Sequence, residues 1–201
     1  MQQFLVATGN PHKTEAIRGI LADYPITLSD LSEHPGIPEP EETGDSFLDN
    51  ALLKSRYYTK LTGLAAMADD SGLEVDALGG APGVHSARYA GADTPHSEKM
   101  ARVLEALKDV PESQRTARFR CVAALTFPDG REYTAEGAME GLIGPAPRGE
   151  GGFGYDPIVF LPELGCTVAE LSPQQKDEIS HRGKAFRALM KKLEVNAAPA
   201  S

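Results

Sequence analysis

The sequence predicts an α/β domain with a mixed central β-sheet flanked by helices. In the first half of the chain, short apolar runs typical of strands alternate with helical patterns, as in parallel βαβ units. In the second half, two strand-like runs flank the turn Pro128-Asp129-Gly130, which predicts a hairpin. The length of 201 residues, 41% of them hydrophobic, suits one domain or one domain with two lobes.

The first half opens with a predicted strand and a capped helix. Residues 3–7 read as a short buried strand, Asn10 is a suitable N-cap, and Pro11 suits the first helical turn, where its missing N–H does no harm. Residues 31–44, rich in proline and glutamate, predict a loop. A second helix is expected over residues 45–61, from the spacing of its apolar side chains.

The remaining elements follow in order. The apolar run 64–68 predicts a strand, Asp69-Asp70-Ser71-Gly72 a turn, and residues 73–77 a second short strand. Further elements are a helix opening at Thr94-Pro95 and ended by Pro111, strands at 119–127, 131–138 and 157–161, a helix at 176–193 and a frayed tail at 196–201.

Composition narrows the class of protein. The net charge of −9 argues against binding a nucleic acid polymer, which needs a basic surface. No apolar run approaches the roughly 20 residues that cross a bilayer, and the N-terminal residues lack a signal-peptide pattern. Cys121 and Cys166 lie within apolar sequence, as reduced core thiols of a cytoplasmic protein do.

Asp69 and Asp70 are the first candidate functional residues. Carboxylates at the end of a buried strand suit binding a metal, transferring a proton or handling a phosphate. Asp-Ser-Gly is also good turn chemistry, so a purely structural role stays open. If strand geometry persists, the two side chains point to opposite faces and are not equivalent ligands.

Two other segments could bind a phosphate and its counterion. The strand, Thr8-Gly9-Asn10 loop and helix place backbone amides and the positive end of a helix dipole together, with His12 and Lys13 adding charge. An ordinary capped helix explains the same residues. In the pair Glu41-Glu42, one carboxylate could reach the same cation as Asp70, or both could be solvated acids preceding a helix.

Two segments of the second half could complete a ligand site. Gly149 to Pro157 combines flexible glycine backbone with Phe153, Tyr155 and an acid, so an aromatic ring could stack on a planar base. A mobile loop is the alternative. Lys176 and Ser180 would share one face of the last helix, beside His181 and Arg182, as a cationic cluster or a solvated basic surface.

Together these segments resemble the inosine triphosphate pyrophosphatase family, also described as XTP/dITP pyrophosphatases. The resemblance covers nearly the whole chain, in the family's order. It rests on the motifs ATGNPHKTEAI, EETGDSFLDNALLKS, ADDSGLEVDALGGAPGVHSARYAG, ARFRC, GGFGYDPIVF and LSPQQKDEISHRGKA. Pro11 and His12 stand where the family often has small residues, which leaves the role of the His12 side chain open.

The resemblance implies a fold, an activity and a set of site residues. The fold would be one elongated, two-lobed domain over residues 1–201, with a nucleotide cleft between the lobes, in a cytoplasmic homodimer. The activity would be Mg²⁺-dependent hydrolysis of ITP, dITP and XTP to the monophosphate and pyrophosphate. Asp70 would be the catalytic proton acceptor, and Glu41 and Asp70 would hold the metal. The substrate would be bound by Thr8, Gly9, Asn10, Pro11, His12, Lys13, Ser71, Phe153, Gly154, Tyr155, Asp156, Lys176, His181 and Arg182.

Two alternatives remain open at this stage. A related pyrophosphatase would act on modified pyrimidine or standard nucleotides, and a non-catalytic sensor would bind a nucleotide without cleaving it. Hypoxanthine and xanthine carry a 6-oxo group that accepts a hydrogen bond, whereas adenine carries a donor there. Guanine also has the 6-oxo group, and the sequence does not reveal how its 2-amino group would be rejected.

Overall fold

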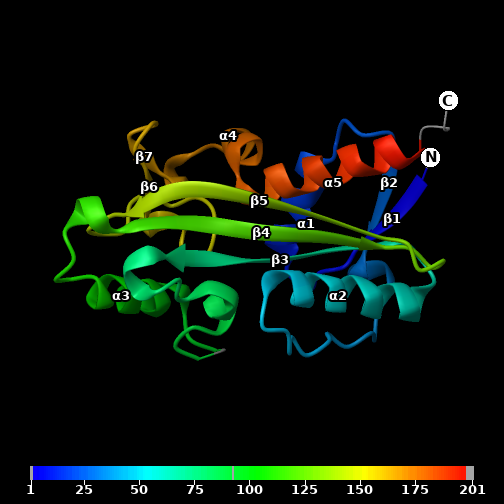
Figure 1. The fold of residues 1–201 in the computed structure, drawn as a ribbon, viewed down its shortest axis with the longest axis horizontal. Coiled ribbons are helices and arrows are strands. Elements are labelled where there is room, and N and C mark those ends of the chain that lie inside the picture. Colours follow the sequence, from blue (N-terminus) through cyan, green and yellow to red (C-terminus); the bar gives the residue numbers. More distant parts are fainter. Residues whose placement is uncertain (1, 92, 198–201) are drawn as a thin grey trace. The chain divides into compact units, whose positions relative to one another are not determined.

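A computed structural model of the protein describes residues 2–91 and 93–197, which form a seven-stranded sheet with helices packed on it (Figure 1). The strand order is β2-β1-β3-β4-β5-β6-β7. The strands are β1 Gln2–Val6, β2 Ile26–Asp30, β3 Ala66–Val75, β4 Thr116–Thr126, β5 Glu132–Ile143, β6 Val159–Leu161 and β7 Cys166–Thr167. β1 pairs in parallel with β2 and β3, whereas β6 pairs antiparallel with β5 and β7. The predicted α/β class with a mixed sheet is confirmed.

Five α-helices lie in the described residues: α1 Pro11–Ile20, α2 Phe47–Thr62, α3 His96–Ala106, α4 Pro173–Ile179 and α5 His181–Ala197. Short 3₁₀ helices connect them, including η3 Gly83–Arg88 and η5 Asp156–Ile158. The predicted tail at 196–201 begins within α5, and its last four residues lie outside the described residues. No helix in the described part of the chain has the length and apolar character needed to cross a membrane.

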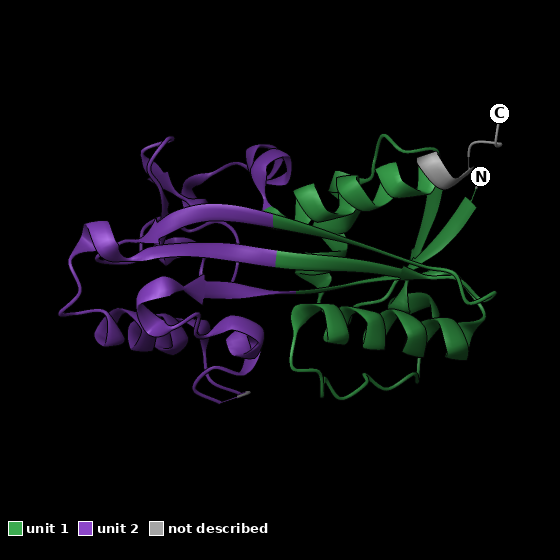
Figure 2. Cartoon of the chain, viewed as in Figure 1, with its two compact units in different colours: residues 1–70, 121–137, 181–201 green, residues 71–120, 138–180 purple. Residues whose placement is uncertain are grey.

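The chain divides into two compact units (Figure 2). Unit 1 comprises the described residues of 2–70, 121–137 and 181–197, and unit 2 those of 71–91, 93–120 and 138–180. Strands β3, β4 and β5 contribute residues to both units. The expectation of a single domain over 1–201 stays a prediction.

Unit 1 buries both faces of its part of the sheet. In β1, Phe4 and Val6 pack into a core that α1 and α5 cover, whereas Leu5 packs with Tyr58 of α2 in a separate cluster. Figure 1 shows α2 on the opposite side of these strands from α5. A strand covered on both faces reads as a continuous apolar run, which is why its position was evident from the sequence.

Unit 2 buries chiefly one face of its strands. Val103 and Leu107 at α3 pack with Phe119, Met139 and Val159 of three strands. Charged residues alternate with these apolar ones along the strands, and Arg118 in β4 pairs with Asp76 at 2.8 Å and with Glu140 at 2.9 Å. This alternation of apolar and polar residues is typical of an antiparallel sheet with one polar face.

The predicted turn at residues 69–72 is wrong, because β3 runs without interruption from Ala66 to Val75. The tendency of Asp-Ser-Gly to form a turn is local and weak. Here the side chains of Asp69 and Asp70 find partners on both faces of the strand, and these tertiary contacts outweigh the local preference.

The predicted helix at 176–193 is two helices. Ser180 adopts an extended conformation, with φ −63° and ψ 152°, between α4 and α5. Lys176 therefore belongs to α4, and His181 and Arg182 open α5, so the predicted shared face does not exist. The strand β2 was also missed, because it is a mostly half-buried edge strand with a weak apolar pattern.

Candidate functional site

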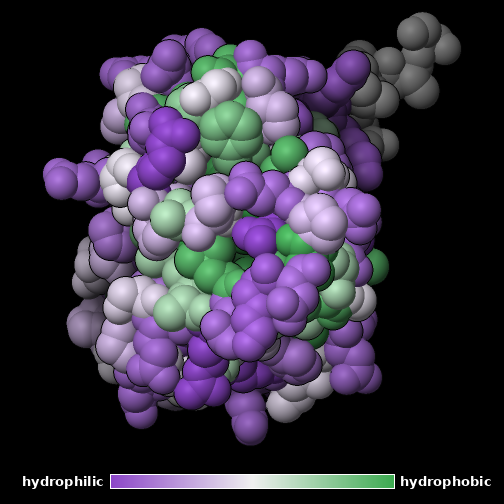
Figure 3. Space-filling view, turned by 90° about the vertical axis from the view of Figure 1, so that its left-hand side faces the viewer, coloured by the Kyte–Doolittle hydropathy of each residue, from purple (hydrophilic) through white to green (hydrophobic). Residues whose placement is uncertain are grey.

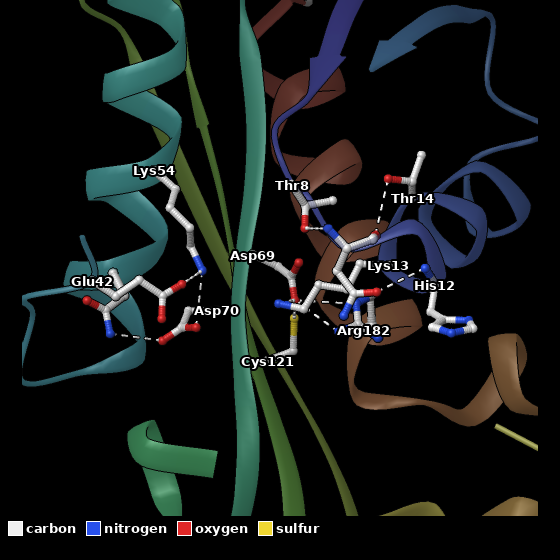
Figure 4. Close-up of polar contacts among 12 residues, drawn as sticks. Thr8, His12, Lys13, Thr14, Glu42, Lys54, Asp69, Asp70, Cys121 and Arg182 are labelled. Atoms are coloured by element: carbon white, nitrogen blue, oxygen red, sulfur yellow. Dashed lines mark hydrogen bonds and ion pairs between the residues drawn. The ribbon is translucent and has the colours of Figure 1, made fainter. Parts of the chain in front are cut away.

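Strand β3 places Asp69 and Asp70 on opposite faces of the sheet (Figure 4). Asp70 faces Lys54 of α2, whereas Asp69 faces Lys13 of α1 and Arg182 of α5. Both acids are buried, with 6% of Asp70 and 1% of Asp69 exposed. As expected from strand alternation, the two carboxylates are not equivalent.

Helix α2 supplies the partners of Asp70. Asn50 donates from Nδ2 to Asp70 at 3.1 Å, and the Lys54 ammonium lies 3.2 Å from Asp70 Oδ1. Asn50 and Lys54 are one helical turn apart, so they present their side chains to the same point of β3. Lys54 also pairs with Glu42 at 2.6 Å. The Asp70 cluster, defined as Asp70, Glu42, Lys54 and Asn50, thus contains two carboxylates and one ammonium.

Burial and neighbouring charges shift the pKa values of Asp70 and Lys54. Burial raises the pKa of Asp70 above its ordinary value, and this outweighs the nearby ammonium groups of Lys54 and Lys13, which lower it. Burial alone would lower the pKa of the Lys54 ammonium. The carboxylates of Asp70, Asp69 and Glu42 outweigh burial, so the pKa of Lys54 is raised. Asp70 is therefore easier to protonate than a solvated aspartate, and Lys54 stays charged.

The other face of β3 carries the Asp69 cluster, defined as Asp69, Lys13, Arg182 and Cys121. The Asp69 carboxylate lies 3.2 Å from the Lys13 ammonium and accepts hydrogen bonds from Arg182 at 3.1 and 3.3 Å. Cys121 Sγ lies 3.8 Å from the same carboxylate. One carboxylate against two cations leaves this cluster with one excess positive charge.

At Asp69, the two neighbouring cations outweigh the effect of burial on the pKa of the carboxyl group. Burial alone would raise its pKa, but Lys13, Arg182 and Lys54 outweigh burial and hold the pKa far below the ordinary value. Burial raises the pKa of the Cys121 thiol, and the Asp69 charge adds to this. Asp69 is consequently a fixed negative charge, and Cys121 stays protonated.

The Thr8-Gly9-Asn10 loop and the start of α1 border a hollow of about 420 Å³ in unit 1. Thr8 Oγ1 accepts from the Asn10 N–H at 3.2 Å, and Asn10 Oδ1 accepts from the His12 N–H at 3.0 Å, which confirms Asn10 as the predicted cap. A side chain at Gly9 would collide with the carboxylate of Glu39. The hollow is lined by Thr8, Gly9, Pro11, Thr14, Glu15, Arg18, Asp30, Leu31 and Ser32.

In unit 2, Phe153, Asp156 and Lys176 form a compact group. Asp156 is 2% exposed; its carboxylate accepts from the Phe153 N–H at 2.7 Å and pairs with Lys176 at 2.5 Å. The Lys176 ammonium lies 4.7 Å from the centroid of the Phe153 ring, in a cation–π contact. Gly154, with a φ of +68°, provides the backbone bend between these residues.

Three predicted site residues take other positions. Ser71 is half-buried and follows Asp70 along β3. Tyr155 is 4% exposed, and its hydroxyl donates to the Ser86 carbonyl at 3.0 Å. His181 is 5% exposed, and its carbonyl packs against Gly137, where a side chain would collide with it.

Sequence reasoning missed Asn50 and Lys54 and preferred Glu41 to its neighbour. In the structure Glu42 reaches Lys54, whereas Glu41 is exposed. The signal was present in α2, where the buried residues include Asn50 and Lys54 among apolar ones. A polar residue in the apolar stripe of a helix needs a buried partner.

The described part of the chain contains no ready-made cage of protein ligands for a metal ion. Within the described residues no group of three or more His, Cys, Asp or Glu side chains converges. The carboxylates of Asp70 and Glu42 do converge on one cation, the Lys54 ammonium. Oxygen donors in this arrangement fit a hard divalent cation that takes its other ligands from phosphate and water.

A second hollow of about 330 Å³ lies in unit 2 and contains none of the predicted site residues. Its lining includes Leu142, Pro145, Ala146, Arg148 and Phe160. Figure 3 shows one face of the molecule, on which hydrophobic patches are interrupted by hydrophilic side chains. Each unit therefore has its own candidate site residues: the Asp69 and Asp70 clusters in unit 1 and the Phe153 group in unit 2.

The protein is an α/β protein in which a capped helix follows the first strand and loop. Its two adjacent buried aspartates have pKa values shifted in opposite directions. The chain belongs to the Ham1 family, whose model matches residues 4–192. It is 49% identical over 189 residues to a dITP/XTP pyrophosphatase of Geobacter sulfurreducens, covering 94% of this chain and 95% of the relative. It is 45% identical over 195 residues to one of Photorhabdus laumondii, covering 96% and 98%.

Solved structures that resemble this chain agree with the family assignment. A HAM1 protein from Coxiella burnetii matches with a TM-score of 0.88 and 43% identity, over 97% of this chain and all of that chain. A nucleoside-triphosphatase described as a dITP/XTP pyrophosphatase, from Mycobacterium abscessus, matches with a TM-score of 0.74 and 44% identity, over 94% and 99%. The family resemblance stated from the sequence motifs is confirmed.

Proposed function

We propose that this protein hydrolyses deaminated purine nucleoside triphosphates (ITP, dITP and XTP) to the monophosphate and pyrophosphate, with Mg²⁺, and so removes them from the nucleotide pool. The relatives named dITP/XTP pyrophosphatase support the reaction and the substrate class. The observation that carries the proposal is the separation of charge across β3. A cluster with excess positive charge surrounds Asp69, and a cluster with excess negative charge surrounds Asp70.

The β- and γ-phosphates, which leave as pyrophosphate, bind at the positive cluster. Lys13 and Arg182 supply one more positive charge than Asp69 neutralises. The first turn of α1 adds the positive end of its helix dipole beside the Thr8-Gly9-Asn10 loop. These groups stabilise the charge that develops on the leaving pyrophosphate.

The Asp70 cluster would hold a divalent cation. Asp70 would hold Mg²⁺, with Glu42 as the second carboxylate that the geometry favours and Glu41 as the alternative expected from the resemblance. When bound, Mg²⁺ neutralises phosphate charge and orients the substrate. Its remaining ligands would be phosphate oxygens and water, since Mg²⁺ keeps several waters in such sites.

Asp70 acts as the proton acceptor for the attacking water. Burial raises the pKa of Asp70, which brings its basicity closer to neutral pH than that of an exposed aspartate. Asn50 and Lys54 hold the carboxylate from one side, through its Oδ2 and Oδ1 atoms. The carboxylate is therefore oriented before the substrate arrives, which is what a general base requires.

The Phe153 group of unit 2 binds the base. The Phe153 ring offers a face for stacking, and Lys176 is held beside it by Asp156. A Lys176 N–H that Asp156 does not use would donate to the 6-oxo group of hypoxanthine or xanthine, whereas the 6-amino group of adenine offers this N–H no acceptor. A buried unpaired donor costs about 1–3 kcal/mol, so adenine is disfavoured.

The homodimer and the cytoplasmic location belong to the same proposal. Both are supported by the resemblance to the pyrophosphatase family, and the net charge of −9 supports the absence of a nucleic acid polymer as partner. Sedimentation of the purified protein at several concentrations tests the dimer. A monomer at all concentrations would contradict it.

A pyrophosphate-release panel tests the function. Purified protein with Mg²⁺ is given ITP, XTP, dUTP, GTP and ATP, and kcat/KM is measured for each. We expect ITP and XTP to exceed ATP by at least about tenfold, the effect of one mismatched hydrogen bond of 1–3 kcal/mol. Equal values for ATP and ITP would end the claim of purine selectivity, and binding without pyrophosphate release would favour a sensor.

A further inference from the structure

Ser86 lies at a junction of three segments within unit 2. It is 6% exposed, its Oγ accepts from the Leu73 N–H at 2.9 Å, and it donates to the Gly83 carbonyl at 2.6 Å. Its carbonyl accepts from the Tyr155 hydroxyl at 3.0 Å. Through one residue, β3, η3 and the segment preceding η5 are therefore joined by buried hydrogen bonds.

Tyr155 has its polar end inside the protein. With 4% of the residue exposed and its hydroxyl on the Ser86 carbonyl, its side chain is committed to this junction. Phe153 and Asp156 make different contacts. Phe153 is half-buried, and Asp156 carries Lys176 against the Phe153 ring. The loop thus has an anchoring residue, Tyr155, between the residues that present a stacking surface.

A buried lysine reinforces the same junction. Lys99 of α3 is 2% exposed, and its ammonium donates to the carbonyl of Ala87, the residue after Ser86. An ammonium buried to this extent is costly unless it is well hydrogen bonded. Segment η3 is therefore held from β3, from α3 and by Tyr155, and the carbonyl groups of Ser86 and Ala87 point to two different elements.

We infer that Ser86 and Tyr155 are positioning residues, which set the Phe153–Asp156 loop against β3 so that Phe153 and Lys176 meet the base in one arrangement. This inference rests on the proposed function, because it takes the ligand of Phe153 and Lys176 to be a planar purine base. Lys99 supports the same junction from α3. None of the three residues needs to contact the nucleotide.

The physical consequence is a loss of preorganisation. Without the Tyr155 hydroxyl, the loop samples several positions, and only a fraction of molecules present Phe153 and Lys176 correctly. Apparent affinity falls in proportion to that fraction, whereas the chemistry at Asp70 is unchanged once the nucleotide is bound. The expected signature is a raised KM with kcat preserved.

The experiment compares Tyr155→Phe with Tyr89→Phe. Both changes remove one hydroxyl from the same apolar cluster, but the Tyr89 hydroxyl makes none of the hydrogen bonds found among the described residues. We expect Tyr155→Phe to raise the KM for ITP about tenfold, with kcat within about twofold of wild type and weaker discrimination against ATP. Tyr89→Phe is expected to leave both constants unchanged.

Ser86→Ala provides a second variant, which removes the bond to Leu73 but keeps the carbonyl that Tyr155 uses. We expect a KM between those of wild type and Tyr155→Phe. The inference is overturned if Tyr155→Phe leaves KM unchanged, or if Tyr89→Phe raises KM as much. If wild-type protein releases no pyrophosphate from ITP, the proposed function fails. Calorimetric binding of ITP to wild type and Tyr155→Phe then decides the positioning role, and equal Kd values would overturn it.

Discussion

The two faces of β3 treat neighbouring aspartates in opposite ways. Asp69 lies between Lys13 and Arg182, and its pKa is held far below the ordinary value. Asp70 shares Lys54 with a second carboxylate, Glu42, and its pKa is raised. Burial is similar on both faces, so the ratio of cations to carboxylates decides the difference.

The comparison shows how one strand can carry a structural and a reactive carboxylate side by side. A buried charge with two cationic partners is stable and resists protonation, and therefore cannot exchange protons near neutral pH. A buried charge that shares one cation is easier to protonate and can bind a further cation. Environments that drive two pKa values apart are typical of acid–base sites.

The largest expected effect is on catalysis in Asp70→Asn. The amide keeps the shape but cannot accept a proton or balance a metal charge, so kcat for ITP should fall by about 10²–10⁴-fold. Stability should hold or rise, because a buried carboxylate with a raised pKa is removed. Pyrophosphate release measures the change in kcat, and thermal unfolding measures the change in stability. Full turnover in this variant would remove Asp70 from the mechanism.

Asp69→Asn is the matched change on the other face. It removes the carboxylate that pairs with the buried guanidinium of Arg182, 3% exposed, so the free energy of unfolding should fall by about 3–5 kcal/mol. Because the pKa of Asp69 is lowered in the folded state, this contribution is present above the ordinary pKa of an aspartate in the unfolded chain and is lost as pH falls below it toward the folded-state pKa. Denaturant titrations at pH 7 and pH 3 check this. Equal stability of wild type and variant at pH 7 would contradict it.

Glu42→Gln and Glu41→Gln distinguish which of the two neighbouring glutamates contributes to Mg²⁺ binding. If Glu42 is the second carboxylate for Mg²⁺, its loss should raise the Mg²⁺ concentration for half-maximal activity about tenfold, as loss of a supporting metal partner does. Glu41→Gln should change it less, since Glu41 is exposed. The reverse order would restore Glu41 as the ligand. Mg²⁺ titrations at saturating ITP provide the measurement.

The smallest change is expected in the pH profile of Lys54→Met. Lys54 lowers the pKa of Asp70, opposing burial, so its removal should raise that pKa further. Activity requires deprotonated Asp70, hence it rises as pH rises through this pKa. The acid limb of kcat/KM should therefore move to higher pH in the variant. An acid limb that stays in place would indicate that another group controls it.

Several parts of the fold could be predicted because they depend on short-range patterns. The apolar run of β1 and the cap at Asn10 followed by Pro11 identified the first strand-loop-helix unit. The hairpin around residues 128–130 and the helix after Pro95 were likewise recognised from turn residues and periodicity. Edge strand β2 was missed because its residues are only half-buried and lack a clear pattern.

The candidate site was predictable in its residue types and less so in its partnerships. Strand alternation correctly separated Asp69 from Asp70, although the segment was expected to turn. Lys176 and Arg182 were expected on one helix, but the extended Ser180 divides them between α4 and α5. Lys176 then meets Asp156, and Arg182 meets Asp69.

The sequence by itself determined the α/β class, the resemblance to a family and the chemical groups available. Local patterns and motifs need only neighbouring residues to be read. Only the tertiary structure decided that Lys54 and Glu42 stand beside Asp70 while Lys13 and Arg182 stand beside Asp69. These residues are far apart in the chain, and their pKa shifts arise from distance and burial. Both are properties of the packed protein rather than of any segment.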